Sequence, residues 1–373
     1  MAMAARAATE KYYYSRYMLV QEEQKQQEHP FKEQIWQLFQ SADRANIEMA
    51  LSWIKSLQIP MFQELEGLKT LYRASCGQRV VQMGGKEIQQ LFSLEHLFIR
   101  QRSLYQIPEV LGRLQQLKKL SIFHSRAKRL PASIGQLHQL EELSIQMSLL
   151  EELPEEIGQL KNLRCLHLGQ LALSYLPKSI GQLQQLEELQ VVASPLMYLP
   201  EEIGQLSSLR KLVVEHSQLE QLPKSIGHCC QLQELSLRNN KLKKLPSKLC
   251  SLQLLQWLDL SQNELRRLPF ALAHLPLLRL LNLDGNQLEK LPCIKNWALL
   301  YELSVRDNQL AKLPATIGRL QQLKTMRVEN NQLSALPLSI MDLQELRSLN
   351  YHKNPLRQKD IDPELIVWLN NNA

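Results

Sequence analysis

The chain has 373 residues, of which 44% are hydrophobic and only 6% are aromatic. Its 44 basic and 37 acidic residues give a formal charge of +7, but both signs are interspersed, so the sequence lacks the basic arm typical of nucleic-acid binding. No apolar stretch approaches the roughly 18 residues that cross a bilayer, and we expect no membrane insertion. Leucine dominates the apolar residues, which indicates a core built largely from one side chain.

The cysteine pattern bears on the compartment. None of the spacings matches a CxxC pair or a zinc-ligand set, and we interpret the cysteines as small buried residues with a few exposed thiols. A reducing, cytoplasmic setting is therefore expected. The N-terminus lacks the continuous apolar segment of a signal peptide, so export by the general route is not expected. The six cysteines are Cys76, Cys165, Cys229, Cys230, Cys250 and Cys293.

Residues 1–30 are polar and rich in glutamine and glutamate, and they predict an N-terminal tail. Residues 31–70 then predict a helical cap. Apolar residues recur at helical spacing in three stretches of this segment: Phe31, Ile35, Leu38 and Phe39, then Ile47, Leu51 and Ile54, and then Phe62 to Leu71. The alternative is that these helices form a separate docking element.

An internal repeat fills most of the remaining chain, and its pattern is LxxLxLxxNxLxxLPxxIGxLxx. The spacing is 23 residues at every step except Leu278 to Leu300, which is 22. A degenerate first repeat is predicted from Leu71, with Val81, Ile88 and Leu91 in phase. The regular repeats begin at Leu94, Leu117, Leu140, Leu163, Leu186, Leu209, Leu232, Leu255, Leu278, Leu300, Leu323 and Leu346.

Each part of the repeat predicts a structural element. The LxLxx segment alternates with period two, which predicts a short strand whose leucines face inward. The proline of LPxxIGxL predicts a short helical or 3-10 turn that returns the chain along the convex side. In the 22-residue repeat we expect Ile294 and Trp297 to take the inward positions. The predicted fold is an α/β solenoid, a right-handed horseshoe with a parallel concave sheet.

Asparagine at the ninth repeat position can bond backbone groups inside the bend after each strand. The second half has this residue throughout, at Asn240, Asn263, Asn286, Asn308, Asn331 and Asn354. The first half has other residues instead, namely Arg102, Ser125, Ser148, Leu171, Ser194 and Ser217. We therefore predict that the first half is less regular and opens more easily.

Residues 357–373 predict a C-terminal cap helix with Leu365, Ile366, Trp368 and Leu369 as its apolar stripe. The repeats, over roughly residues 71–356, resemble the leucine-rich-repeat superfamily. They are most similar to the intracellular 23-residue LPxxIGxL class of bacteria and plants, which includes scaffolds for Ras-group GTPases. The resemblance implies protein binding, and by analogy of fold it makes a small GTPase one candidate partner.

Catalytic motifs are not found in the sequence, which lacks GxxxxGK, HExxH and GxSxG. We therefore expect neither an enzyme nor a cofactor. Four histidines, His96, His124, His167 and His216, map to outward positions of the concave sheet. His96 begins its strand and His124 lies beyond the end of the next one, so a rise of ~3.3 Å per residue keeps them apart. We accordingly expect no metal site.

Apolar side chains on the outward face of the first-half strands predict a protein-binding patch, because clustered exposed apolar residues mark interfaces. The second half instead alternates charge along one row: Arg238, Ser261, Asp284, Arg306 and Glu329. We predict a non-enzymatic interaction scaffold; the alternative is a regulatory subunit that docks through its N-terminal helices. The patch comprises Phe98, Arg100, Lys119, Phe123, His124, Met147, His167, Val192 and Val213.

Overall fold

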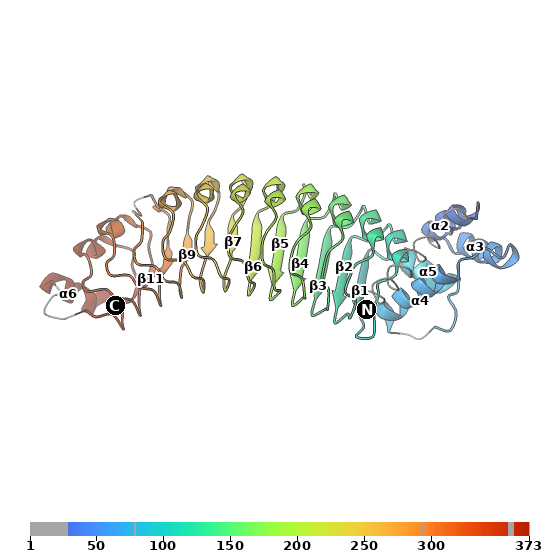
Figure 1. The fold of residues 1–373 in the computed structure, drawn as a ribbon, viewed down its shortest axis with the longest axis horizontal. Coiled ribbons are helices and arrows are strands. Elements are labelled where there is room, and N and C mark those ends of the chain that lie inside the picture. The colour runs from blue at the N-terminus through green and yellow to red at the C-terminus, as the bar shows by residue number, and fades with distance from the viewer. Residues whose placement is uncertain (1–28, 78–79, 293, 295, 357–361, 373) are drawn as a thin grey trace, which may run out of the picture.

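The computed structural model describes residues 29–77, 80–292, 294, 296–356 and 362–372. Within these residues twelve strands form one parallel sheet in the order β1 to β12, so each strand pairs with its neighbours in the sequence. The molecule is a gently arched solenoid, with 3-10 turns along the outer edge and helices at both ends (Figure 1). The predicted horseshoe of parallel strands with short 3-10 turns is confirmed. The predicted tail of residues 1–30 lies almost wholly outside the described residues.

The strands differ in length between the two halves. The first six have five residues each: β1 (His96–Arg100), β2 (Lys119–Phe123), β3 (Glu142–Gln146), β4 (Cys165–Gly169), β5 (Glu188–Val192) and β6 (Lys211–Glu215). The last six have three residues each: β7 (Glu234–Ser236), β8 (Trp257–Asp259), β9 (Leu280–Asn282), β10 (Glu302–Ser304), β11 (Thr325–Arg327) and β12 (Ser348–Asn350). Strand length is uniform within each half, so a less regular and more easily opened first half stays a prediction.

In the described part of the chain, ten 3-10 helices return the chain along the convex side. They are η1 (Glu109–Arg113), η2 (Ala132–Gln136), η3 (Glu155–Gln159), η4 (Lys178–Gln182), η5 (Glu201–Gln205), η6 (Lys224–His228), η7 (Ser247–Ser251), η8 (Phe270–His274), η9 (Ala315–Arg319) and η10 (Leu338–Asp342). The repeat proline lies one residue before each helix, as Pro108 does with φ −65° and ψ 144°, rather than at its first position. Its fixed φ suits this extended entry as well.

The core lies between the sheet and the turns. In β1 the side chains of Leu97 and Ile99 are buried, whereas His96, Phe98 and Arg100 point to the concave surface and are exposed. This alternation follows from the two-residue period of a strand. Because every repeat offers the same leucines, one continuous apolar core runs along the solenoid.

The asparagine ladder forms as predicted. Asn286, for example, accepts a hydrogen bond from the Leu265 backbone N–H at 3.0 Å and donates to the carbonyls of Leu260 and Leu283 at 2.9 and 3.0 Å. In the first half a serine satisfies fewer groups: the Ser194 hydroxyl accepts from the Leu171 N–H at 3.2 Å. The asparagine bends thus bind neighbouring repeats through more side-chain hydrogen bonds than the serine bends.

Among the described residues four α-helices precede the sheet (Figure 1): α2 (Lys32–Gln40), α3 (Arg44–Ser56), α4 (Phe62–Cys76) and α5 (Gly85–Phe92). Helix α4 packs against β1 and η1, and the other three helices pack against one another, with α5 also packed against α4. The contact with the repeats is specific. Arg113 of η1 lies 5.2 Å from the Trp36 ring centroid and pairs with Glu33 at 2.7 Å, which lowers the pKa of Glu33 through this hydrogen bond. Helices α2 and α4 thus contact the first repeat directly.

The degenerate repeat predicted from Leu71 is wrong. Helix α4 continues through Leu71, and Val81, expected to point inward, is almost fully exposed. Ile88 and Leu91 are buried, but in helix α5. Apolar residues three and four apart on a helix face satisfy part of the repeat pattern, which explains the error.

The C-terminal end carries helix α6 (Pro363–Asn372), which packs against η10 and buries Leu365. In the 22-residue repeat Ile294 and Trp297 are fully buried, as predicted. The indole N–H of Trp297 also donates to the Leu272 carbonyl at 3.1 Å. None of the described helices is long and apolar enough to cross a membrane.

Candidate protein-binding face

The concave face consists of three rows of side chains that run across the strands. Row 1 starts at His96, row 2 at Phe98 and row 3 at Arg100, and each row continues 22 or 23 residues later in the next repeat. Residues in one row on adjacent strands lie ~4.8 Å apart. In most repeats the residue that follows the row-3 position has a positive φ, which turns the chain away from the sheet.

The structure brings two predicted aromatic residues together at the N-terminal end of this face. Phe98 in row 2 of β1 is 48% exposed, and its ring centroid lies 5.4 Å from that of Phe123 in row 3 of β2. Arg100 is exposed and pairs in register with Phe123. Lys119 is exposed as well, although its ammonium pairs with Glu142 at 2.8 Å. The result is an apolar surface with basic neighbours.

The remaining predicted residues are distributed further along the face. His124 and Met147 follow β2 and β3 in the positive-φ position, with φ of 53° and 52°. His167 and Val192 are half-buried in rows 2 and 3. Val213, expected to be exposed, is only 7% exposed, because side chains from adjacent strands crowd together on a concave surface. It therefore contributes little surface to a partner.

A hollow of about 250 Å³ lies on this face at Gly169, which leaves row 3 without a side chain on β4. Met147, His167 and Val192 line it, so three predicted residues share one depression. A Cβ atom at Gly169 would lie 3.6 Å from Cγ of Gln146, an ordinary contact. The backbone does not require glycine here, and the hollow results from the missing side chain alone.

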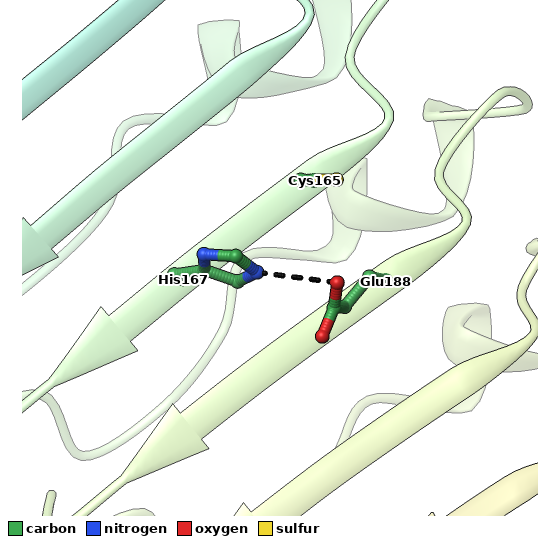
Figure 2. A group of neighbouring side chains, drawn as sticks. All are labelled: Cys165, His167 and Glu188. Carbon is green, nitrogen blue, oxygen red and sulfur yellow. Dashed lines mark ion pairs between the residues drawn. The ribbon is translucent and has the colours of Figure 1, made fainter.

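Next to this hollow the structure gathers three side chains with metal-ligand chemistry. Sγ of Cys165, a ring nitrogen of His167 and a carboxylate oxygen of Glu188 all lie within 4.8 Å of one another. Figure 2 shows His167 on one strand directed at Glu188 on the next, with Cys165 beside them. The sequence analysis missed this cluster, because it compared histidines with histidines. Its signal is CxH in one strand with glutamate 23 residues after the cysteine.

The pKa of the thiol and the pKa of the carboxylate in this cluster are shifted in opposite directions. Burial raises the pKa of the Cys165 thiol, and the carboxylates of Glu188 and Glu142 raise it further. Burial also acts to raise the pKa of Glu188, but the hydrogen bond from Gln190 and the charges of His167 and Lys211 outweigh it and lower that pKa. The cluster thus combines a protonated thiol with an ionised carboxylate at neutral pH.

In row 3 the C-terminal half of the concave face is different, because charged residues there pair with each other. Arg306 lies 2.8 Å from Asp284 and 3.6 Å from Glu329, so the predicted alternating row forms a ladder. The hydrogen bond to Asp284 raises the pKa of Arg306. Arg327 pairs with Glu302 in the adjacent rows. These groups already have partners within the chain.

A second, larger groove of about 1030 Å³ runs along the leucine-proline turns, outside the concave sheet. Tyr175 and Tyr198 line it from the same position of successive repeats. The Tyr175 hydroxyl donates to Glu152 at 2.8 Å, and this hydrogen bond raises the tyrosine pKa. The sequence analysis missed this groove; two tyrosines before consecutive leucine-proline pairs were its signal.

The fold and these surfaces can be compared with known proteins. The family description Leucine rich repeat matches residues 207–265 and 230–288. An internalin of Listeria monocytogenes is 21% identical with a TM-score of 0.64, over 80% of this chain and 84% of its own. A second internalin of that organism, InlJ, is 17% identical with a TM-score of 0.56, over 77% of this chain and 69% of its own.

A chain from an octameric complex of Latrophilin 3, Unc5D and the leucine-rich-repeat part of FLRT2 is 23% identical. It has a TM-score of 0.60 and covers 71% of this chain and 83% of its own. No relative among the curated proteins matches the sequence. At these identities the structural likenesses establish the fold. The family match over residues 207–288, together with the twelve strand repeats, indicates that this part of the chain is built from leucine-rich repeats.

Proposed function

We propose that this chain is a protein-interaction scaffold that binds its partner through the concave face of β1 to β6. Leucine-rich repeats present a rigid curved surface of exposed side chains, and they generally serve as binding modules rather than as enzymes. The observation that carries the proposal is the contact on the concave surface between the exposed Phe98 and the half-buried Phe123. Clustered apolar side chains on one face mark an interaction surface.

A comparison of the two halves of the concave face supports the N-terminal half as the binding surface. The C-terminal rows hold ion pairs such as Asp284 with Arg306, which would have to be broken or desolvated by a partner. In rows 2 and 3 the N-terminal strands offer Phe98 and Phe123, and Met147 follows β3, and these three side chains can be covered without breaking an ion pair. Aromatic side chains and methionine are enriched in the buried centre of protein interfaces.

The surroundings of the aromatic pair indicate the chemistry of the partner. Arg100 stands beside Phe123 in the register, and Lys119 lies in the same strand as Phe123. A partner that offers an apolar side chain flanked by acidic groups would complement both features. Capture of a small GTPase with such a surface would agree with the resemblance to Ras-group scaffolds.

Charge placed on the aromatic pair tests the proposal. The double variant Phe98→Glu, Phe123→Glu is expected to lose its partner in crosslinking and mass spectrometry from native lysate. Glutamates would repel the acidic groups and remove the apolar contact. Phe98 is exposed and Phe123 is half-buried, and both lie outside the hydrophobic core, so the melting temperature should change little. The matched control is Phe270→Glu, an exposed aromatic residue of η8 on the convex side. Capture that persists in the double variant would refute the proposal.

We also propose that the protein acts in the cytoplasm as a member of the 23-residue intracellular class. The five cysteines that the structure describes are unpaired thiols, which fits a reducing compartment. The spacing of 23 residues between successive leucines of the repeat supports the class. Fractionation of cells that produce the chain from its own gene, followed by immunodetection, measures its compartment.

A further inference from the structure

We propose that Cys165, His167 and Glu188 form a binding site for a divalent transition-metal ion, with Zn²⁺ as the expected occupant. This inference goes beyond the proposed protein binding and does not depend on it. The three side chains come from adjacent strands β4 and β5, whose pairing fixes their relative positions. A site on paired strands is held more rigidly than a site on loops.

The register explains why these three side chains converge. Cys165 pairs directly with Glu188 in row 1, so their side chains are neighbours across the strands. His167 lies two residues after Cys165 and therefore points to the same face. All three ligand atoms lie within 4.8 Å of one another, so small side-chain rotations bring them to the ~2.0–2.3 Å bonds of a zinc ion.

The two oxygen atoms of the Glu188 carboxylate have different neighbours. Its Oε1 atom accepts a hydrogen bond from Gln190 and lies 3.7 Å from the Lys211 ammonium. Its Oε2 atom faces His167 at 3.5 Å. In known metal sites, residues that do not touch the metal often hydrogen-bond to a ligand side chain and thereby fix its orientation. Gln190 and Lys211 thus leave Oε2 available for a metal.

His167 supplies the observation that points most directly to a ligand. Its Nε2 atom is buried and makes no hydrogen bond, and its nearest partner is the Glu188 carboxylate at 3.5 Å (Figure 2). A buried ring nitrogen that makes no hydrogen bond is costly, and a bound ion between the two groups would satisfy it. The row around Cys165 is also unusual, because the neighbouring repeats place ion-pairing residues such as Lys119, Glu142 and Lys211 there.

The ligand types select the metal. Thiolate and imidazole ligands suit Zn²⁺ and exclude Mg²⁺ or Ca²⁺ as preferred occupants, because those ions take oxygen ligands. Three protein ligands leave one tetrahedral position open, and the hollow at Gly169, which His167 also lines, gives it room for a water molecule or a side chain of another protein. Binding replaces the thiol proton by the metal and releases that proton to solvent.

Zinc titration of reduced, chelator-treated full-length protein tests the site. In competition with a chromophoric chelator, the wild type should bind Zn²⁺, and Cys165→Ala and His167→Ala should each weaken this binding at least about 100-fold. Glu188→Gln should weaken it by about 10-fold or more. Cys230→Ala, which removes an exposed thiol outside the cluster, should leave the affinity unchanged. Co²⁺ in place of Zn²⁺ should give a thiolate charge-transfer absorption that Cys165→Ala abolishes.

Thermal unfolding of the metal-free variants provides the control for folding. The three side chains lie outside the hydrophobic core, so the melting temperatures should match that of the wild type. Added Zn²⁺ should raise the melting temperature of the wild type and of Cys230→Ala, but not that of Cys165→Ala. Wild-type protein without measurable Zn²⁺ affinity, or an affinity that survives Cys165→Ala, would overturn the proposal.

Discussion

Replacing Asn286 by alanine is expected to lower the free energy of unfolding by about 3 kcal/mol. The change removes the acceptor for the Leu265 N–H and the donor to the carbonyls of Leu260 and Leu283, all inside the bend. The Leu265 N–H, left buried without a partner, costs about 1–3 kcal/mol. The carbonyls of Leu260 and Leu283 keep hydrogen bonds from Asn263 and Asn308, so each bond lost there costs about 0.5–1.5 kcal/mol. Urea denaturation followed by circular dichroism measures the effect.

The matched control for this change is Ser217→Ala at the equivalent position of an earlier repeat. The Ser217 hydroxyl donates only to the Glu215 carbonyl at 3.1 Å, so its loss should cost about 1 kcal/mol or less. The difference between the variants also measures how much more firmly asparagine closes a bend than serine does. Equal losses would contradict the account of the ladder and of an N-terminal half that opens more easily.

Replacing Trp297 by alanine is expected to cost about 4 kcal/mol, which is typical for removal of a large buried aromatic residue. The indole fills the interior of the 22-residue repeat, where it is fully buried, and its N–H satisfies the Leu272 carbonyl. A cavity there would loosen the link between β9 and β10 and with it the continuity of the sheet. The melting temperature and the urea midpoint report the loss.

Trp257→Ala is the control for the tryptophan prediction. Trp257 stands in row 1 of the concave face and is about half exposed, so its removal should change the free energy of unfolding by about 0.5 kcal/mol or less. If both tryptophan variants lost the same stability, the short repeat would not depend on its indole. In that case the compensation for the missing residue would lie elsewhere.

Much of the fold could be predicted because the apolar pattern of each repeat indicates both its strand and its turn. The alternation around Leu97 and Ile99 predicts the strand, and the recurrence of the pattern predicts parallel stacking. The N-terminal boundary was harder, because Leu71, Ile88 and Leu91 satisfy both the repeat and a helix face. Apolar spacing alone does not distinguish the last cap helix from a first repeat. Strand length could not be predicted either, because the leucine pattern is the same in repeats whose bend has asparagine and in repeats whose bend has serine.

The binding face could be predicted only as far as the direction of each side chain. Phe98 and Phe123 point outward as expected, and the structure adds that their rings touch. The burial of Val213 depends on how closely adjacent strands crowd on the concave side, which no single strand reveals. The hollow at Gly169 likewise exists only in relation to its neighbours. Predicting the Cys165 cluster requires the register between adjacent strands. The 23-residue spacing gives this register, because it places Glu188 opposite Cys165.

Site-specific photocrosslinking tests the central claim most directly, because it reports which surface the partner touches. A photoreactive amino acid at Ser121, which pairs in register with Phe98, should crosslink the captured partner. The same amino acid at Tyr198, which is 51% exposed in the groove along the turns, should not. Partner adducts from Ser121 alone are the predicted result. Adducts from Tyr198 without any from Ser121 would place the partner on the turns and contradict binding at the concave face.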